Sequence, residues 1–175
     1  MMRLGSSPHV ILVRGVFRGQ MPHSSHDQLG VVMDFMERGS LATLQDRLHE
    51  APHWPLVFRL AHQVALGVNF LHSLSPALLH LDLKPGNVLL DNDLNAKIAD
   101  FGLSRIYHSV SRCSRVVGEE GGGTTSYMPP EAFDLAYKPD RAYDIYRYTK
   151  SVLFCPPWRG IVLCSLLKVS SLFTP

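Results

Sequence analysis

The chain has 175 residues, 46% of them hydrophobic and 18% charged, so it is long enough to bury a core and too apolar for wholesale disorder. Its formal net charge is +2, and its lysines and arginines are scattered with no basic stripe between aromatic residues, which gives no support to nucleic-acid binding. No apolar tract reaches the length of a membrane span or a signal-peptide core, and three cysteines without metal-ligand spacing indicate reduced thiols, so we expect a cytoplasmic chain.

The first part of the chain predicts two strands followed by two helices. Residues 10–17 and 29–36 are rich in Val, Leu, Ile and Phe, and the polar segment between them favours an antiparallel pair. Ser40 precedes leucines at 41, 44 and 48, which is the spacing of a short helix with a serine N-cap. From Trp54 to Ser73 apolar residues recur every three or four positions, and Pro55 stands in the first turn, so we expect a long amphipathic helix.

The second part predicts short elements. Residues 88–90 and 97–99 are expected to be short strands around the turn at 91–93. Residues 104–123 are rich in Ser, Arg, Glu and Gly and are expected to form a mobile loop. The prolines and aromatic residues from Tyr127 to Tyr148 indicate short helices, one of them beginning at Tyr143, and the residues after Lys150 match no element that we can assign.

One loop carries the residues of a reaction site. Residues 80–87 read HLDLKPGN, and Asp100-Phe101-Gly102 follows across the predicted strand-turn-strand. Phosphoryl transfer needs a carboxylate that accepts the proton of the attacking hydroxyl, an amide and a second carboxylate that hold Mg²⁺, and a cation at the transferring phosphate. Asp82, Asn87, Asp100 and Lys84 supply these roles in that order, so we predict Asp82 and Lys84 as catalytic residues and Asn87 and Asp100 as metal ligands.

Three motifs identify the resemblance. HLDLKPGN, ADFGLS and SYMPPE resemble the catalytic loop, the metal-binding loop and the end of the activation segment of eukaryotic protein kinases. Lys84 after the acid resembles the serine/threonine kinases. With ALGVNFLHSLSPALLHLDLK and YDIYRY, residues 1–148 resemble the receptor-interacting Ser/Thr kinase family, most closely the member that serves NOD-type innate immune receptors. The resemblance implies a signalling kinase that uses ATP and Mg²⁺ on a protein substrate, with NOD-type receptors or other kinases of the family as partners.

The same resemblance implies the fold and its division. We expect an α+β, protein-kinase-like fold with a remnant of the small lobe and the hinge at residues 1–38, including two antiparallel strands. Residues 39–148 would form a partial, mainly helical large lobe with the catalytic and activation segments. Residues 149–175 would be a divergent, non-homologous tail.

The nucleotide-binding residues are carried over by resemblance alone. Met33 resembles the gatekeeper at the back of the pocket, and Asp34 and Met36 resemble hinge positions whose backbone groups meet the edge of adenine. Leu89 would lie beneath adenine.

Other positions would support the catalytic loop. The resemblance implies that Thr124 is a third catalytic residue, which hydrogen-bonds Asp82 and Lys84. It also implies that His80 and Phe101 stack between the lobes and that Asp144 anchors the loop backbone. Many kinases carry arginine at the position of Leu81, where it pairs with an activation-loop phosphate, a contact that leucine cannot make. We therefore expect that phosphorylation within residues 104–126 does not order the loop through Leu81.

Two features depart from the kinase pattern. The sequence has no lysine before Lys84 and no G-x-G-x-x-G before it, although kinases use both at the nucleotide phosphates. We expect a chain truncated at both ends that turns over little or no ATP. The alternative is a non-catalytic, pseudokinase-like fragment that binds partners.

A different enzyme class also has a literal motif. His49-Glu50-Ala51-Pro52-His53 fits the zinc-protease pattern H-E-x-x-H, which requires one continuous helix. Pro52 disfavours a helical Ala51, so we expect no zinc site there.

Overall fold

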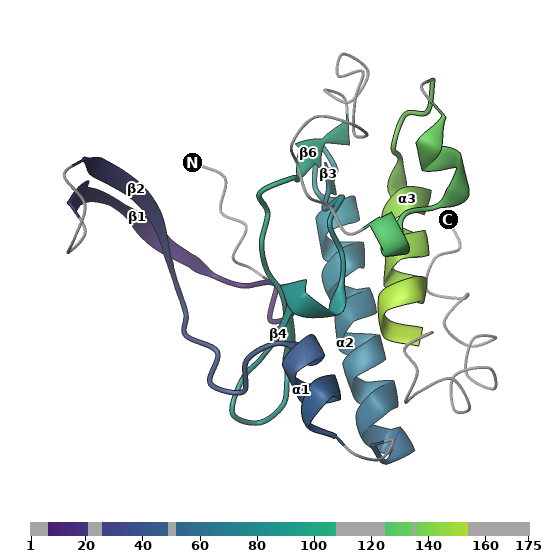
Figure 1. Cartoon of the computed structure of the whole chain (residues 1–175), viewed down its shortest axis with the longest axis horizontal. Helices are drawn as coiled ribbons and strands as arrows, with labels where there is room; N and C mark the ends of the chain where they lie inside the picture. Colours follow the sequence, from purple (N-terminus) through teal and green to yellow (C-terminus); the bar gives the residue numbers. More distant parts are fainter. Residues whose placement is uncertain (1–6, 21–25, 49–51, 108–124, 135, 154–175) are drawn as a thin grey trace.

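The computed structural model describes residues 7–20, 26–48, 52–107, 125–134 and 136–153. A two-stranded hairpin stands away from a body built around the long helix α2 (Trp54–Ser73), with α3 (Arg141–Tyr148) beside it (Figure 1). None of the helices in these ranges combines the length and apolar character that crossing a bilayer requires. The α+β fold is the one expected from the sequence.

The hairpin consists of β1 (Val13–Gln20) and β2 (Asp27–Met33), which pair antiparallel from Val13 opposite Met33 to Gln20 opposite Asp27. The predicted pairing is confirmed, but both strands are displaced toward the hairpin tip. For β1 the cause is that the residues before it bond to the body: the Ile11 amide donates to the Ile98 carbonyl at 2.8 Å, and the Ile98 amide donates to the His9 carbonyl at 2.9 Å.

The first two helices form where the sequence predicts them. Helix α1 (Leu41–Arg47) begins after Ser40, whose Oγ accepts a hydrogen bond from the Thr43 amide at 3.2 Å. Helix α2 begins at Trp54 and ends at Ser73, the predicted bounds. At Gly67 the His9 carbonyl comes so close that a Cβ atom would lie 2.7 Å from it, so this position on α2 accommodates the incoming N-terminal segment.

Four short strands make two further ladders. Strand β4 (Val88–Leu90) pairs antiparallel with β5 (Ala96–Ile98), which begins one residue earlier than predicted. Strand β3 (Leu78–Leu79) pairs antiparallel with β6 (Arg105–Ile106), and neither was predicted. Strand β6 lies at the start of the segment that we expected to be a loop, of which residues 108–123 lie outside the described residues.

The last described elements are helical. The short turn at Pro130–Phe133 agrees with the short helices predicted from Tyr127 to Tyr148, and another turn, at Thr125–Tyr127, was not predicted. Helix α3 begins at Arg141 rather than Tyr143, because the Asp140 side chain caps it by accepting from the Ala142 amide at 2.8 Å. It continues as a π-helical turn over Thr149–Leu153, where we assigned no element.

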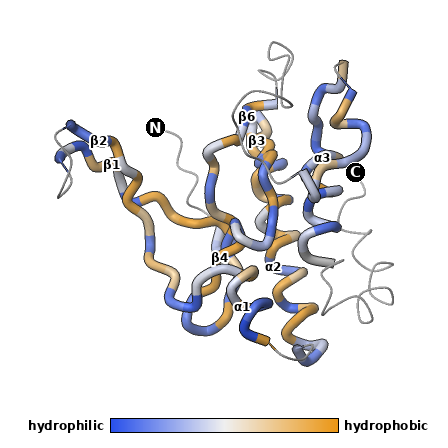
Figure 2. The backbone as a smooth tube through the Cα atoms, in the orientation of Figure 1, coloured by the Kyte–Doolittle hydropathy of each residue, from blue (hydrophilic) through white to orange (hydrophobic). Residues whose placement is uncertain are grey.

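The main core lies along the inner face of α2. In Figure 2 apolar residues recur along α2 and run through the segment that leads from the body into β1. The core joins α2 to β3, β4 and β5 through fully or almost fully buried side chains, among them Leu60, Val64, Leu71, Val88, Leu90 and Ile98. The hairpin, by contrast, leaves Leu29 76% and Val31 57% exposed.

Candidate active site

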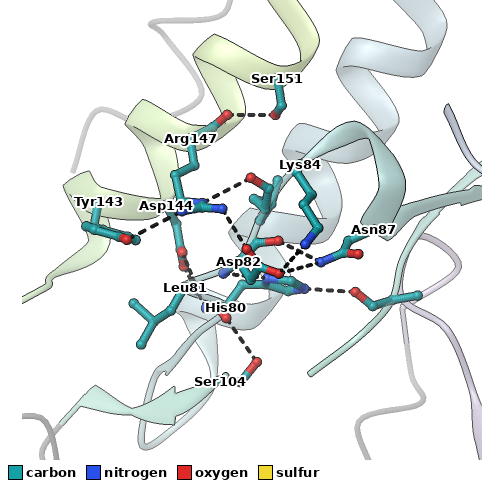
Figure 3. Close-up of polar contacts among 12 residues, drawn as sticks. His80, Leu81, Asp82, Lys84, Asn87, Ser104, Tyr143, Asp144, Arg147 and Ser151 are labelled. Carbon is teal, nitrogen blue, oxygen red and sulfur yellow. Dashed lines mark hydrogen bonds and ion pairs between the residues drawn. The ribbon is translucent and has the colours of Figure 1, made fainter. Parts of the chain in front are cut away.

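Asp82 and Lys84, two of the three predicted catalytic residues, lie together in the loop between β3 and β4 (Figure 3). Lys84 Nζ lies 2.8 Å from Asp82 Oδ2. Asn87 donates through Nδ2 to the Asp82 carbonyl oxygen at 2.8 Å and to Asp82 Oδ2 at 3.0 Å. The 3-10 turn Pro85–Asn87 folds the loop back and makes this contact possible. Two residues of the same loop, Lys84 and Asn87, therefore hold Asp82 through its Oδ2 atom.

Asp144 of α3 fixes the backbone of this loop. Its Oδ2 accepts from the His80 amide and its Oδ1 from the Leu81 amide, both at 2.8 Å, and His72 Nε2 lies 2.9 Å from Oδ2. Leu81 has a left-handed φ of 65°, which costs free energy in a residue other than glycine. Because Asp144 satisfies the amides at and before this position, it stabilises the strained turn, in the role expected from the resemblance.

Leu81 directs its side chain into an apolar cluster. It is 4% exposed and shares this cluster with Leu79, Ala132 and Tyr143. The position is therefore part of the packing between the catalytic loop and the segment before α3. Its insensitivity to loop phosphorylation stays a prediction.

His80 connects the catalytic loop to the segment after β5. Its Nε2 donates to the Ala99 carbonyl at 3.0 Å, while its Nδ1 accepts from the Asp82 amide at 3.3 Å. Burial lowers the pKa of His80, although the nearby Asp144 carboxylate acts in the opposite direction. The imidazole also contacts the Phe101 ring, with centroids 5.1 Å apart, in the tilted arrangement common for aromatic pairs.

Asn87 and Asp100 are brought to the same place by the backbone. The Ala99 amide donates to the Asn87 carbonyl at 2.9 Å, which puts the next residue, Asp100, beside Asn87. Asp100 is exposed, with a φ of 62°, and its Oδ1 accepts from the Gly102 amide at 3.2 Å. Asn87 makes its two contacts to Asp82 through nitrogen, so its amide oxygen is left for another ligand.

This donor set fits Mg²⁺. The ion prefers oxygen ligands and is usually held by one or two side chains together with substrate phosphates and water. A site built only from protein ligands is not seen: within the described residues no three His, Cys, Asp or Glu side chains form a group that could hold a metal. Asn87 and Asp100 therefore suit a metal that arrives with a nucleotide.

The residues predicted to bind the nucleotide are only partly brought together. Met36 is 7% exposed and packs in one apolar cluster with Ile11, Ala99, Leu89 and Phe101. Met33, at the end of β2, is 41% exposed and lies outside this cluster.

Asp34 makes a contact that the sequence analysis did not include. Its Oδ1 lies 2.7 Å from Arg14 Nε on the neighbouring strand, and this hydrogen bond lowers the pKa of Asp34. Its side chain therefore contacts the hairpin, and only its backbone groups are left for the predicted hinge role. Thr124, the remaining predicted catalytic residue, lies outside the described residues.

Arg147 of α3 was missed by the sequence analysis. Its side chain is fully buried, and its Nη2 lies 2.7 Å from Asp82 Oδ1. The available signal was the spacing: Arg147 follows Asp144 by three residues, which places both on one side of the helix. We had no reason from composition to expect an arginine in the interior.

The structure describes only Pro52 and His53 of the zinc-protease motif. Residues 49–51 lie outside the described residues, α1 ends at Arg47, and His53 stands before α2 with an extended ψ of 135°. His53 therefore lies outside both helices, and the predicted absence of a zinc site stays a prediction.

Comparisons with known proteins show which family the chain belongs to. The sequence pattern of the protein kinase domain matches residues 1–154. Receptor-interacting serine/threonine-protein kinase 2 of Bos taurus is 49% identical over 127 residues, 69% of this chain and 23% of its own length. Receptor-interacting serine/threonine-protein kinase 3 of Rattus norvegicus is 47% identical over 118 residues, 67% of this chain and 24% of its own length.

A relative whose name also includes ankyrin repeats matches as well. Ankyrin repeat and protein kinase domain-containing protein 1 of Mus musculus is 42% identical over 142 residues, 80% of this chain and 18% of its own length. The chain thus spans about a quarter or less of each of these relatives. From the domain match and these identities, the chain belongs to the protein kinase family and is related to the receptor-interacting serine/threonine kinases.

Proposed function

We propose that the site formed by Asp82, Lys84, Asn87 and Asp100 transfers the γ-phosphate of ATP to serine or threonine hydroxyls of a protein substrate. Asp82 would orient the hydroxyl and accept its proton, and Lys84 would neutralise the transferring phosphate. The observation that carries the proposal is the catalytic loop itself, in which Lys84 Nζ and Asn87 Nδ2 lie 2.8 and 3.0 Å from one oxygen of a buried carboxylate. Thr124 would add a hydrogen bond to Asp82 and Lys84.

Mg²⁺ and ATP are the cofactors of this proposal. Asn87 and Asp100 would hold the ion, which when bound neutralises charge that develops on the phosphates. The apolar cluster of Leu89 and Met36 supports an adenine site, because both side chains lie beside Phe101 of the metal-binding loop. Met33 and the backbone of Asp34 would complete it on the hairpin side.

The proposed rate of transfer by these 175 residues is low. The sequence contains no lysine before Lys84 and no glycine-rich G-x-G-x-x-G before it, so two groups that contact the nucleotide phosphates in kinases are not supplied. Loss of one preorganised charge-stabilising group commonly costs about 3 kcal/mol in a transition state. We expect ATP binding to be measurable even where the turnover of ATP is too slow to detect.

The biological setting is part of the proposal. The 49% identity to receptor-interacting serine/threonine-protein kinase 2 supports a receptor-linked kinase role, and the family resemblance adds a cytoplasmic, innate-immune signalling setting. NOD-type receptors or kinases of the same family would be partners.

A second function is a non-catalytic interaction fragment. It is favoured by the hairpin, where Leu29 and Val31 lie on one face of β2 and Val16 pairs with Val31 from β1; all three side chains are more than half exposed. Large apolar side chains gathered on one surface commonly mark a site where a protein partner binds.

The test is nucleotide-dependent thermal stabilisation of the purified chain. ATP with Mg²⁺ should raise the melting temperature of the wild type, and the shift should be lost in Asp100→Asn, because a ligand that binds only the folded state stabilises it. The absence of a shift at millimolar ATP would overturn the nucleotide site and favour the interaction fragment.

A transfer assay tests the proposed low rate. Labelled phosphate should move to protein hydroxyls slowly or not at all. Rapid transfer that is abolished by Asp82→Asn would contradict the low rate while supporting the assignment of Asp82.

A further inference from the structure

We infer that Arg147 is a positioning residue of this site: it fixes the Asp82 carboxylate and sets the direction from which a substrate hydroxyl can reach it. The inference depends on the proposed function only in calling Asp82 catalytic. The contact between Arg147 and Asp82 stands without it.

The guanidinium of Arg147 contacts two consecutive residues of the catalytic loop, and its contact with Asp82 is drawn in Figure 3. Its Nη2 lies 2.7 Å from Asp82 Oδ1, and its Nε donates to the Leu83 carbonyl at 3.0 Å. On the other side, Nη1 donates weakly to Tyr143 Oη at 3.4 Å, and the guanidinium carbon lies 5.8 Å from the Tyr143 ring centroid. Because the guanidinium is planar and its donors are fixed, these contacts define the position of Asp82 Oδ1 relative to the Asp82-Leu83 backbone.

The two carboxylate oxygens of Asp82 have different hydrogen-bond partners. Oδ2 accepts from Lys84 and Asn87, while Oδ1 has Arg147. A carboxylate offers about four lone-pair sites, two on each oxygen, so the site left for a hydroxyl is on Oδ1. Arg147 occupies the other site of that same oxygen. A substrate hydroxyl that hydrogen-bonds to Asp82 would therefore lie next to Arg147 Nη2.

Burial makes this contact specific. Arg147 is fully buried, and a buried guanidinium is stabilised only when its charge is compensated and its donors are bonded. Asp144, one turn earlier on α3, is already bonded to His80, Leu81 and His72, which leaves Asp82 as the partner for this cation. Helix α3 thus supplies both the Asp144 carboxylate, which holds the loop backbone, and the Arg147 cation, which holds the Asp82 carboxylate.

The side chain of Asn87 reports on this positioning without any nucleotide. Its Nδ2 donates to Asp82 Oδ2, the oxygen that Arg147 does not touch. If Arg147 fixes the carboxylate, removing its charge should let the Asp82 side chain rotate and release the Asn87 Nδ2 hydrogen that bonds to Oδ2, while the bond from Nδ2 to the Asp82 carbonyl stays. A role for Arg147 in packing alone would not move this amide selectively.

The experiment is hydrogen exchange of side-chain amides by NMR on the full chain. In Arg147→Met the Asn87 side-chain amide should exchange at least about tenfold faster, the effect of losing roughly one charge-assisted hydrogen bond. Arg147→Lys, which keeps the cation, should restore most of the protection. Tyr143→Phe is the matched control, because it removes only the 3.4 Å contact and should leave Asn87 unchanged.

Two further measurements separate loss of the Arg147 contact from loss of folding. The His80 and Leu81 amides, which Asp144 holds, should stay protected in Arg147→Met, and this shows that the loop is folded. If Arg147→Met does not fold, the contact is tested from its other side: Asp82→Asn should speed exchange of Arg147 Nη2 but not of Nε, which Leu83 holds. Unchanged Asn87 exchange in folded Arg147→Met, or unchanged Nη2 exchange in Asp82→Asn, would overturn the inference.

Discussion

The catalytic loop and the β1–β2 hairpin are held in opposite ways. The loop is buried, and α3 bonds to it through Asp144 and Arg147. The hairpin has its own strand ladder, and its described ion pairs, Arg14–Asp34 at 2.7 Å and Arg18–Asp27 at 3.8 Å, are largely exposed. Exposed ion pairs contribute little to stability. The chemistry-bearing loop therefore depends on the helices, while the hairpin that leads to the predicted hinge depends mainly on its own pairing.

Removing the Asp144 anchor should have the largest effect. Asp144→Ala leaves the His80 and Leu81 amides buried and unbonded and removes the partner of His72, so we expect a loss of about 3–5 kcal/mol in the free energy of unfolding. Urea denaturation measures it, with the exposed Asp93→Ala as control. A loss of less than about 1 kcal/mol would mean that α3 does not hold the loop.

A matched pair of leucines contrasts the two regions directly. Leu60 on α2 is fully buried, and Leu29 on β2 is 76% exposed. Leu60→Ala should cost about 2–5 kcal/mol of unfolding free energy, because it leaves a cavity in the core. Leu29→Ala should change it by no more than about 0.5 kcal/mol. Equal losses, measured by urea denaturation, would show that the hairpin face is buried in solution.

The link between the regions can be loosened at Gly67. A Cβ atom there would lie 2.7 Å from the His9 carbonyl and 2.8 Å from Ile98 Cδ1, so Gly67→Ala should push the N-terminal segment off α2. We expect a loss of about 1–3 kcal/mol in thermal or urea unfolding, typical of overpacking. Gly15→Ala on β1 is the control, because no atom lies within 4 Å of its added Cβ. A stabilised Gly67→Ala would contradict this close approach.

The smallest expected effect is a dependence on pH. Burial lowers the pKa of His80, so the folded chain binds its proton less readily than the unfolded chain does. The contribution of His80 to stability is therefore present above its unfolded pKa of about 6.5 and is lost as the pH falls toward the lower folded value. His80→Asn should reduce the decline in unfolding free energy between about pH 6.5 and 5, whereas the exposed His62→Gln should not. Identical pH profiles for all three proteins would contradict the assignment.

The sequence predicted what local patterns determine. The bounds of α2 follow from apolar spacing and Pro55, and the Ser40 cap of α1 follows from side-chain chemistry. Asp82, Lys84 and Asn87 could be assigned together because the chemistry of phosphoryl transfer requires these residue types within one short loop.

The remaining features depend on contacts between distant segments. Strand β6 has two residues at the edge of a polar segment, too few to show a period, and it forms because β3 offers a partner. An arginine in a helix usually faces solvent. Arg147 is part of the interior only because the fold places Asp82, 65 residues earlier in the chain, next to it. The spacing of residues along the chain shows neither the pairing of β6 with β3 nor the contact of Arg147 with Asp82.

The comparison is tested most directly by native-state hydrogen exchange of backbone amides. We predict that the His80 and Leu81 amides exchange only through global unfolding, with a free energy of opening equal to that from urea denaturation. The ladder amides of β1 and β2 should exchange through local opening at a clearly lower free energy. Hairpin amides protected as strongly as His80 and Leu81, or a catalytic loop that exchanges as fast as the hairpin, would contradict the account.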